Sequence, residues 1–402
     1  PNDLELRDAQ LAAEAGGRGI AESVFAPGSA PSEDELARAL AARVGAAGSE
    51  PGLDGSGEEL RTRVAARLAA AAEATTKGRR EPGPMSLPVV RDEMAAKSLF
   101  GPSTLEEFAT CPYRWFVEHE LKPKEIEPES DALTSGQVAH GVLETLYRER
   151  PGGQARPTLA TLEQWRSRAI ELIEEVGAKK LPRERSTTAA TLRRTEGLVL
   201  AFVTDEAATT VPYDPDVDLF EASFGLDRSD KPAFEIADGA GIHGQIDRID
   251  LGPSREALVQ DYKSSSKVEG GKGMLGRGKL QLQLYMLAVR ELWGLELAGG
   301  LYRPLGGTGN RQPKGLLRKE LLDDLEALDP RPNDHLADED FEQALEDARE
   351  RAGEIVGEIH AGDIGRRPLN GKCPEFCSFQ PICRRERGLI EEAPDGEDEG
   401  DE

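Results

Sequence analysis

The feature that most constrains the fold is a pair of strand-like runs, residues 242–251 and 257–262, joined by a short Gly-Pro turn. The second run is apolar until it reaches Asp261, and Lys263 follows two residues later. Because alternate side chains of a strand share a face, Asp261 and Lys263 project together while the tyrosine between them points away. If the neighbouring strand brings Asp247 alongside, two carboxylates and one ammonium converge at one place.

The segments around these runs alternate between helical and strand patterns. Helices are predicted at about residues 103–111, 135–147, 159–208 and 279–293, and further strands at 219–224 and 300–303. Ser103 with Glu106 is interpreted as the cap of the first helix, and Ser135 as the start of the second. The long third helical stretch is charged, which we interpret as a solvated insertion. This order predicts an α/β fold in which helices flank a central mixed sheet.

The two ends of the chain differ from its middle. Residues 1–96 are rich in alanine and acids, with helical signatures that begin at Ser32 and Ser56, so we expect a helical leader followed by a linker. Residues 388–402 are acidic and predicted to be disordered. The catalytic domain is expected at residues 97–387. Because the chain begins without methionine, we expect it to be a fragment of a longer protein.

Charge and hydropathy narrow the function classes. The formal net charge of -25 argues against general, non-specific affinity for nucleic acid, although it leaves room for a local basic channel. No segment approaches eighteen consecutive apolar residues and no signal peptide is recognisable, so a cytoplasmic protein with no membrane contact is predicted. The segment 273–279 has the glycine and lysine spacing of a phosphate loop, but Leu280 replaces the required Ser or Thr. We therefore predict no ATPase, and a basic loop able to contact DNA phosphates.

The acidic pair suits phosphodiester hydrolysis. Carboxylate oxygens bind Mg²⁺ and leave several waters for exchange, and the metal polarises the phosphate and acidifies a bound water. Lys263 would orient the hydroxide or neutralise developing charge. An ordinary salt bridge at a sheet edge is the alternative interpretation. Further along, His140 and Glu144 lie one helical turn apart, as do Gln281 and Tyr285, although a lone histidine and a core tyrosine are also commonly structural.

Four blocks in this order resemble the RecB-type branch of the PD-(D/E)XK nucleases, which implies a restriction-endonuclease-like core. They are Gly-x-x-x-His ending at His140, Gly-x-x-Asp ending at Asp247, Asp-x-Lys from Asp261 to Lys263, and Gln-x-x-x-Tyr from Gln281 to Tyr285. By this resemblance His140, Asp247 and Asp261 hold Mg²⁺ or Mn²⁺. Lys263 serves catalysis, and Gln281 and Tyr285 support the site or contact DNA.

The chain contains only four cysteines, Cys111 before these blocks and Cys373, Cys377 and Cys383 after them. Disulfides are improbable without a secretion signal, so binding of a soft metal is the better interpretation, and four thiolates can hold a four-iron, four-sulfur cluster. The one-plus-three split resembles the AddB-type nuclease domain of bacterial helicase–nuclease complexes. By this resemblance, residues 1–96 are either the remnant of a helicase-like region or an unrelated leader. The spacing from Cys373 to Cys377 is one residue longer than in that family, which keeps a Cys₄ zinc site as the lesser alternative.

The resemblance implies a Mg²⁺-dependent deoxyribonuclease, most simply an exonuclease. It would act on single-stranded DNA ends exposed by a helicase partner or a fused helicase region during double-strand-break repair by recombination. Two alternatives remain open at this point. One is a non-catalytic module that binds DNA ends and uses the cluster for stability, and the other is an iron–sulfur exonuclease of the type used in CRISPR adaptation.

Overall fold

The computed structural model describes residues 84–123, 131–181, 187–307, 311–374 and 377–383, which belong to one compact unit. The helical signatures predicted at Ser32 and Ser56 and the acidic tail lie outside these residues. Within the described part of the chain, no helix combines the length and the apolar character that a membrane crossing requires.

A six-stranded mixed sheet forms the centre of the fold, with the strand order β2-β5-β6-β7-β8-β9. Its strands are β2 (Asp214–Phe224), β5 (Gly244–Leu251), β6 (Ala257–Lys263), β7 (Leu297–Pro304), β8 (Lys314–Arg318) and β9 (His335–Leu336). The first three strands pair antiparallel, β6 and β7 pair parallel, and β7 and β8 pair antiparallel again. Every residue of β7 is buried, as expected for a strand covered on both faces. The predicted α/β fold with a central mixed sheet is confirmed.

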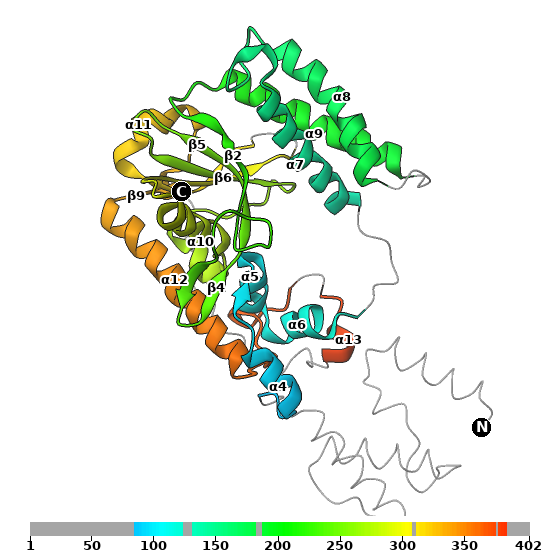
Figure 1. Cartoon of the computed structure of the whole chain (residues 1–402), viewed down its shortest axis with the longest axis vertical. Coiled ribbons are helices and arrows are strands. Elements are labelled where there is room, and N and C mark those ends of the chain that lie inside the picture. Colours follow the sequence, from blue (N-terminus) through cyan, green and yellow to red (C-terminus); the bar gives the residue numbers. More distant parts are fainter. Residues whose placement is uncertain (1–83, 124–130, 182–186, 308–310, 375–376, 384–402) are drawn as a thin grey trace, which may run out of the picture. The chain divides into compact units, whose positions relative to one another are not determined.

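Three helices cover one face of the sheet: α7 (Asp131–Glu149), α8 (Leu162–Lys180) and α9 (Thr188–Ala208) (Figure 1). Trp165 of α8 and Phe202 of α9 are buried in the cluster that also holds Tyr262 of β6. The interpretation of residues 159–208 as a solvated insertion is therefore wrong, because the charged outer surface of these helices conceals an apolar inner one. The prediction that Ser135 opens the second helix is also wrong, since α7 begins at Asp131.

The opposite face of the sheet is covered by α10 (Gln281–Ala288), which continues as a π-helical turn (Val289–Trp293), and by α12 (Asp338–His360) (Figure 1). Every residue of α10 after Gln281 is buried, because this helix makes the crossover between the parallel strands β6 and β7. Leu284, Met286 and other apolar side chains of α10 join the largest core cluster. The predicted helix at 279–293 is confirmed.

Short elements complete the unit. A three-stranded sheet has the order β1 (Leu99–Phe100), β4 (Ala240–Ile242), β3 (Phe234–Ala237). The first helices are α4 (Pro88–Ala95), α5 (Pro102–Thr110) and α6 (Pro112–Phe116), followed by a π-helical turn (Val117–Leu121). The remaining turns are Pro151–Gly153, Lys272–Arg277, Lys319–Leu321, α11 (Leu322–Leu325), Glu326–Leu328, Pro332–Asp334, Leu369–Gly371 and α13 (Gln380–Cys383).

The predicted cap of α5 is wrong. The N-cap residue is Gly101, Pro102 occupies the first turn, and no side chain caps the helix. Proline is well suited to that place because its missing N–H would have no helical partner there. Glu106 is consequently available for a different contact, which is described below.

Candidate active site

In both β2 and β5, the regular alternation of side chains between the two faces of the sheet is interrupted at the same level. Phe220 packs against the helices α7 to α9, whereas Ala222, which would share its face in a regular strand, packs in the α10 core. In β5, Arg248 bonds to α9 while Ile246 lies in the α10 core. The change in β2 falls at Glu221, whose φ of +49° is left-handed, just after an irregularity in the pairing with β5. Such bulges bend a strand and redirect its side chains.

Three carboxylates lie in a row across this level. Arg248 pairs with Phe220 on one side and with Gln260 on the other. One residue along, the same register sets Glu221 opposite Asp247 and Asp247 opposite Asp261. Ligand atoms of Glu221, Asp247 and His140 all lie within 4.8 Å of one another, whereas among the described residues Asp261 belongs to no such group of three.

Asp247 links the sheet to helix α7. Its Oδ2 accepts a hydrogen bond from the backbone N–H of Tyr262 at 2.6 Å, just beyond the end of the β5–β6 ladder. Its Oδ1 lies 3.2 Å from Nδ1 of His140, whose ring meets the Tyr262 ring edge to face. Burial alone would lower the pKa of His140, but the charge and hydrogen bond of Asp247 raise it. The carboxylate thus continues the strand pairing and orients the histidine.

The Asp-x-Lys strand end is joined to α10 by a chain of polar contacts. Nζ of Lys263 lies 2.6 Å from Oδ2 of Asp261 and donates to Oε1 of Gln281 at 2.8 Å. Nε2 of Gln281 then lies 3.4 Å from the hydroxyl of Tyr285. Each of these predicted site residues therefore touches the next one, and Lys263 is held on the side opposite to Tyr262.

Burial and mutual repulsion shift the acidic groups. Burial, together with the charge of Asp247, raises the pKa of Asp261 to about 6 in spite of Lys263. Burial likewise raises the pKa of Glu221 to about 7, again with Asp247 adding to the effect. Lys263 would have its pKa lowered by burial, but Asp261 raises it, so the ammonium stays charged. Closely set carboxylates with raised pKa values are frequent at functional sites.

Two cavities open on either side of this strand end. The first, of about 450 Å³, is lined by Gly136, Gln137, His140, Gly141, Glu144, Lys180, Glu221, Gln245, Asp247 and Ser264. The second, of about 330 Å³, is lined by Glu106, Lys263, Ser264, Ser265, Lys267, Val268, Glu269, Lys279 and Tyr302. Gly136 allows α7 to approach, because a Cβ there would lie 2.3 Å from Oγ of Ser264. Ser264 borders both cavities, so the strand end separates two adjoining hollows.

Glu106 binds the first residues of α10. The sequence pattern predicted instead that this residue takes part in the cap of α5. Its Oε1 accepts the backbone N–H groups of Leu280 and Gln281, each at 2.8 Å, and its Oε2 lies 3.2 Å from Nζ of Lys279. A carboxylate satisfies helix N-terminal N–H groups and interacts favourably with the helix dipole. This contact places Gln281 where it meets Lys263.

Two further basic residues of the loop before α10 are engaged. Lys272 pairs with Asp340 at 2.5 Å, and Arg277 pairs with Glu269 at 2.8 Å. With Lys279 bound to Glu106, the cations that we predicted would contact DNA phosphates already have acidic neighbours. A phosphate would have to compete for them, since exposed ion pairs are weak and exchangeable.

A buried ionic network under the site was missed by the sequence reasoning. Glu206 of α9 is fully buried and bonds to Arg248 at 3.0 Å and to Arg303 at 2.7 Å, with Arg156 at 3.4 Å. Burial would raise the pKa of Glu206, but the three guanidinium groups hold it well below its usual range. Charged residues on otherwise apolar strands, such as Arg248, were the available signal. The network fixes α9 to the strands that carry the carboxylates.

The cysteines lie near the α5–α6 junction and the end of the described chain, and these four residues form no disulfide. Burial raises the pKa of the Cys111 thiol, backbone N–H groups of Arg114 and Tyr113 oppose this, and the nearby thiols of Cys383 and Cys373 raise it further. Among the described residues, the thiols are not a set whose ligand atoms all lie within 4.8 Å. The fold nevertheless brings Cys111 within electrostatic range of cysteines near the other end of the domain.

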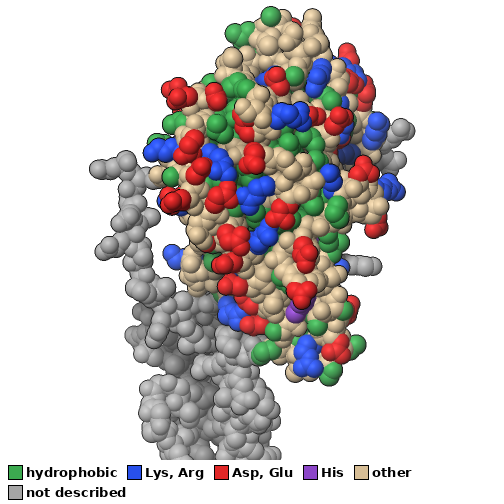
Figure 2. Space-filling model, turned by 60° about the vertical axis from the view of Figure 1, so that its left-hand side comes forward, with side chains coloured by type: hydrophobic (Ala, Val, Ile, Leu, Met, Phe, Trp, Pro, Cys, Tyr) green, Lys and Arg blue, Asp and Glu red, His purple; other side chains and the backbone are tan. Residues whose placement is uncertain are grey.

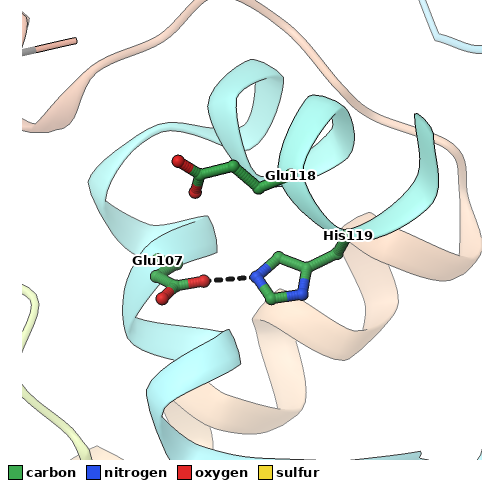
Figure 3. A group of neighbouring side chains, drawn as sticks. All are labelled: Glu107, Glu118 and His119. Carbon is green, nitrogen blue, oxygen red and sulfur yellow. Dashed lines mark hydrogen bonds and ion pairs between the residues drawn. The ribbon is translucent and has the colours of Figure 1, made fainter. Parts of the chain in front are cut away.

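Beside Cys111 lies a second group of possible ligands, Glu107, Glu118 and His119 (Figure 3). Glu107 of α5 contacts Nε2 of His119, whose ring stacks on Trp115. Glu118 is already paired with Arg114 at 2.9 Å. These groups are part-exposed and already have partners, so we assign them the structural role of holding the π-helical turn against α5.

Lys and Arg side chains are interspersed with Asp and Glu over the face shown in Figure 2. This mixture agrees with the strongly negative formal charge of the chain. A protein that meets DNA through such a face would gain little from counterion release, because the acidic side chains among the cations oppose phosphate binding.

Comparison with known proteins agrees with this geometry. Residues 100–384 match the profile of the PD-(D/E)XK nuclease superfamily. An ATP-dependent helicase/deoxyribonuclease subunit of Moorella thermoacetica is 28% identical over 343 residues, covering 70% of this chain and 29% of that protein. Its counterpart from Lactococcus lactis subsp. cremoris strain SK11 is 23% identical, over 71% of this chain and 26% of its own length. The exonuclease/helicase subunit RexB of strain MG1363 matches with the same identity and coverage. The chain thus spans between a quarter and a third of these relatives.

Proposed function

The chain belongs to the PD-(D/E)XK nuclease superfamily, and from this premise we propose that it hydrolyses DNA phosphodiester bonds with Mg²⁺ or Mn²⁺ held at Asp247 and Asp261. The observation that carries the proposal is the row of carboxylates beside Lys263, at the border of two cavities. Hard carboxylate oxygens, with an imidazole beside them, fit the chemistry of these cations.

Each residue has a role that follows from its contacts. When bound, the cation polarises the phosphate and lowers the pKa of a coordinated water. Asp247 and Asp261 would hold it, and His140 would complete the set from α7. Lys263, kept in place by Gln281, presents its ammonium where negative charge develops on the phosphate. Tyr285 fixes Gln281, so it positions the lysine without touching the phosphate.

We also propose that Cys111, Cys373, Cys377 and Cys383 hold a four-iron, four-sulfur cluster. Two backbone N–H groups point at the Cys111 sulfur, which stabilises a thiolate ligand. Tetrahedral zinc with bonds of roughly 2.3 Å would bring the sulfur atoms to about 3.8 Å from one another. Zinc held by the same four thiolates is the lesser alternative.

The names of the relatives suggest the setting. Proteins described as helicase/deoxyribonuclease subunits match this chain over roughly a quarter of their own length. We propose that the nuclease works with a helicase, removes single-stranded DNA from ends as an exonuclease, and serves double-strand-break repair by recombination. The cavity beside Lys263, lined by Lys267 and Lys279, is a suitable place for the phosphate next to the scissile one.

The test is cleavage of end-labelled single-stranded DNA by the full chain with Mg²⁺ or Mn²⁺, with and without EDTA. Asp261→Asn and Lys263→Ala should each lower the rate at least about a hundredfold, because each removes a ligand or a charge that acts on the transition state. Lys319→Ala removes an exposed lysine far along the chain from the site and should stay within twofold of the wild type. A wild type that binds DNA ends and cuts none with any divalent cation would establish the non-catalytic module instead.

A further inference from the structure

Glu221 has a backbone conformation that the rest of the fold reserves for turns and helix ends. The other described non-glycine residues with positive φ are Lys122, Arg150, Arg255, Asp329 and Asn370, which flank helical turns or lie in loops. Glu221 alone among these lies inside a strand. Left-handed backbone is unfavourable for a residue with a Cβ and persists where the surroundings impose it, commonly at functional sites.

The conformation delivers the carboxylate to a specific set of neighbours. Ligand atoms of Glu221, His140 and Asp247 all lie within 4.8 Å of one another. All three side chains line the 450 Å³ cavity. Within the described part of the chain, the Glu221 carboxylate makes no hydrogen bond or ion pair, whereas Glu144 in the same cavity pairs with Arg148 at 3.2 Å.

Two carboxylates so close together repel each other unless one of them takes up a proton or a cation lies between them. The site offers two carboxylates and one imidazole, and the cavity leaves room for waters that would fill the remaining positions of an octahedral ion. Lys180, the basic residue that borders this cavity, donates instead to the backbone carbonyl of Gln137 at 2.9 Å.

We propose that Glu221 is a further ligand of a divalent cation, which it holds together with His140 and Asp247 on the β2 side of Asp247. This inference rests on the proposed nuclease function, and it extends the carboxylate row by one strand. Asp247 then stands between two acidic neighbours, Asp261 on β6 and Glu221 on β2, and contributes to cation binding on both sides.

If Glu221 only maintained the backbone bulge, a different result would follow, and a glycine substitution distinguishes this structural role from a metal-ligand role. Glycine adopts positive φ readily, so Glu221→Gly should relieve the backbone while removing the carboxylate. If Glu221 serves only the bulge, this variant keeps full cation binding. If it is a ligand, the variant is at least as stable as the wild type without metal and binds the cation poorly. Glu221→Gln removes the charge and keeps the side-chain volume.

The experiment measures Mn²⁺ binding to EDTA-treated full chain at fixed pH, from the free Mn²⁺ signal in electron paramagnetic resonance. We expect the dissociation constant to rise at least tenfold in Glu221→Gln and Glu221→Gly. Glu144→Gln, which removes a negative charge from the same cavity, should stay within threefold. The rise in melting temperature caused by Mn²⁺ should shrink in the two Glu221 variants and stay unchanged in Glu144→Gln.

Wild-type affinity in both Glu221 variants would overturn the inference, as would an equal loss in Glu144→Gln, which would indicate a general effect of charge. These outcomes are independent of cleavage. If the wild type cuts DNA and the variants bind Mn²⁺ normally, the inference fails and the nuclease function stands. If the wild type binds Mn²⁺ through Glu221 and cuts no DNA, the function fails and the cation site stands.

Discussion

Asp261 is held between two opposing influences. It is almost fully buried, which disfavours its charge, and it lies 2.6 Å from the ammonium of Lys263, which favours it. Burial prevails, and the pKa rises from the ordinary 3.8 to about 6. At neutral pH without metal the ionised carboxylate therefore lowers the stability of the fold. Such a cost is common where function requires a charge at a site shielded from water.

This balance predicts a pH dependence in the metal-free protein. Because the folded chain binds more protons than the unfolded chain between about pH 4 and pH 6, its free energy of unfolding should fall as pH rises through that window. The loss is at most about 3 kcal/mol, since one pKa unit corresponds to about 1.4 kcal/mol. Urea unfolding of Asp261→Asn should show a shallower slope, because Glu221, whose pKa is also raised, still contributes, and higher stability than the wild type at neutral pH. Asp218→Asn, on the exposed side of β2, should keep the slope. A less stable Asp261→Asn at every pH would contradict the account.

Single residues were predictable where alternation along one strand decides their direction. The common face of Asp261 and Lys263 follows from the strand alone, and the spacing of Gln281 and Tyr285 from one helix. Glu221 was beyond such reasoning. Its place opposite Asp247 depends on the pairing register after a bulge and on a positive φ, and nothing in the residues around it indicates either.

At the scale of elements, helix α10 is positioned from its first turn. Glu106 accepts two backbone N–H groups there and contacts Lys279. Glu106→Ala should lower the free energy of unfolding by about 1–2 kcal/mol, the usual cost of losing a helix cap. It should also lower nuclease activity, because Gln281 at the helix start holds Lys263.

Chemical unfolding and cleavage rates check this expectation. Glu346→Ala, at an exposed position of α12, should change neither by more than about 0.5 kcal/mol or twofold. Glu106→Gln keeps one acceptor oxygen and should fall between the alanine variant and the wild type. Unchanged stability in Glu106→Ala would show that water replaces the carboxylate at the start of α10.

Hydrophobic periodicity predicted the existence and type of most helices and strands. It did not predict which side chains contact the ends of these elements. The sequence Ser103 to Glu106 has the spacing of a capping box, yet the preceding Gly101 and Pro102 already start α5 and turn Glu106 toward α10. A cap is a local pattern, and a contact between residues 174 positions apart is set by the tertiary fold.

At the scale of the described molecule, Cys111 at the α5–α6 junction lies near Cys373 and Cys383 at the end of the described chain. A loop of more than 250 residues is costly to close by chain entropy alone, though the cost grows only logarithmically with length. Metal–thiolate bonds are strong enough to exceed that cost. The proposed cluster would therefore act on stability, and it lies on different elements from the carboxylates.

Anaerobically purified full chain should be brown and contain iron and sulfide. Cys111→Ser should lose the colour, unfold at a lower temperature and become sensitive to proteases between α5 and α7, because the staple is gone. Iron and sulfide analysis, absorbance and limited proteolysis measure these effects. Reduction of the wild-type cluster should leave the cleavage rate within about twofold, as hydrolysis transfers no electrons. If zinc were found in place of iron, the cofactor assignment would change, but the stabilising link between the two ends of the domain would remain.

The hydrogen bond from the Tyr262 backbone to Asp247 bears on how a substrate trap should be made. Replacing this aspartate removes a metal ligand and also frees a buried N–H at the point where β5 and β6 part. A complex captured with such a variant would report on a loosened sheet as much as on bound DNA. Lys263 has a half-exposed side chain and ends its strand, so its replacement leaves the backbone hydrogen bonds of the sheet in place. Lys263 is therefore the better position for an inactive variant that keeps bound DNA uncut for structure determination.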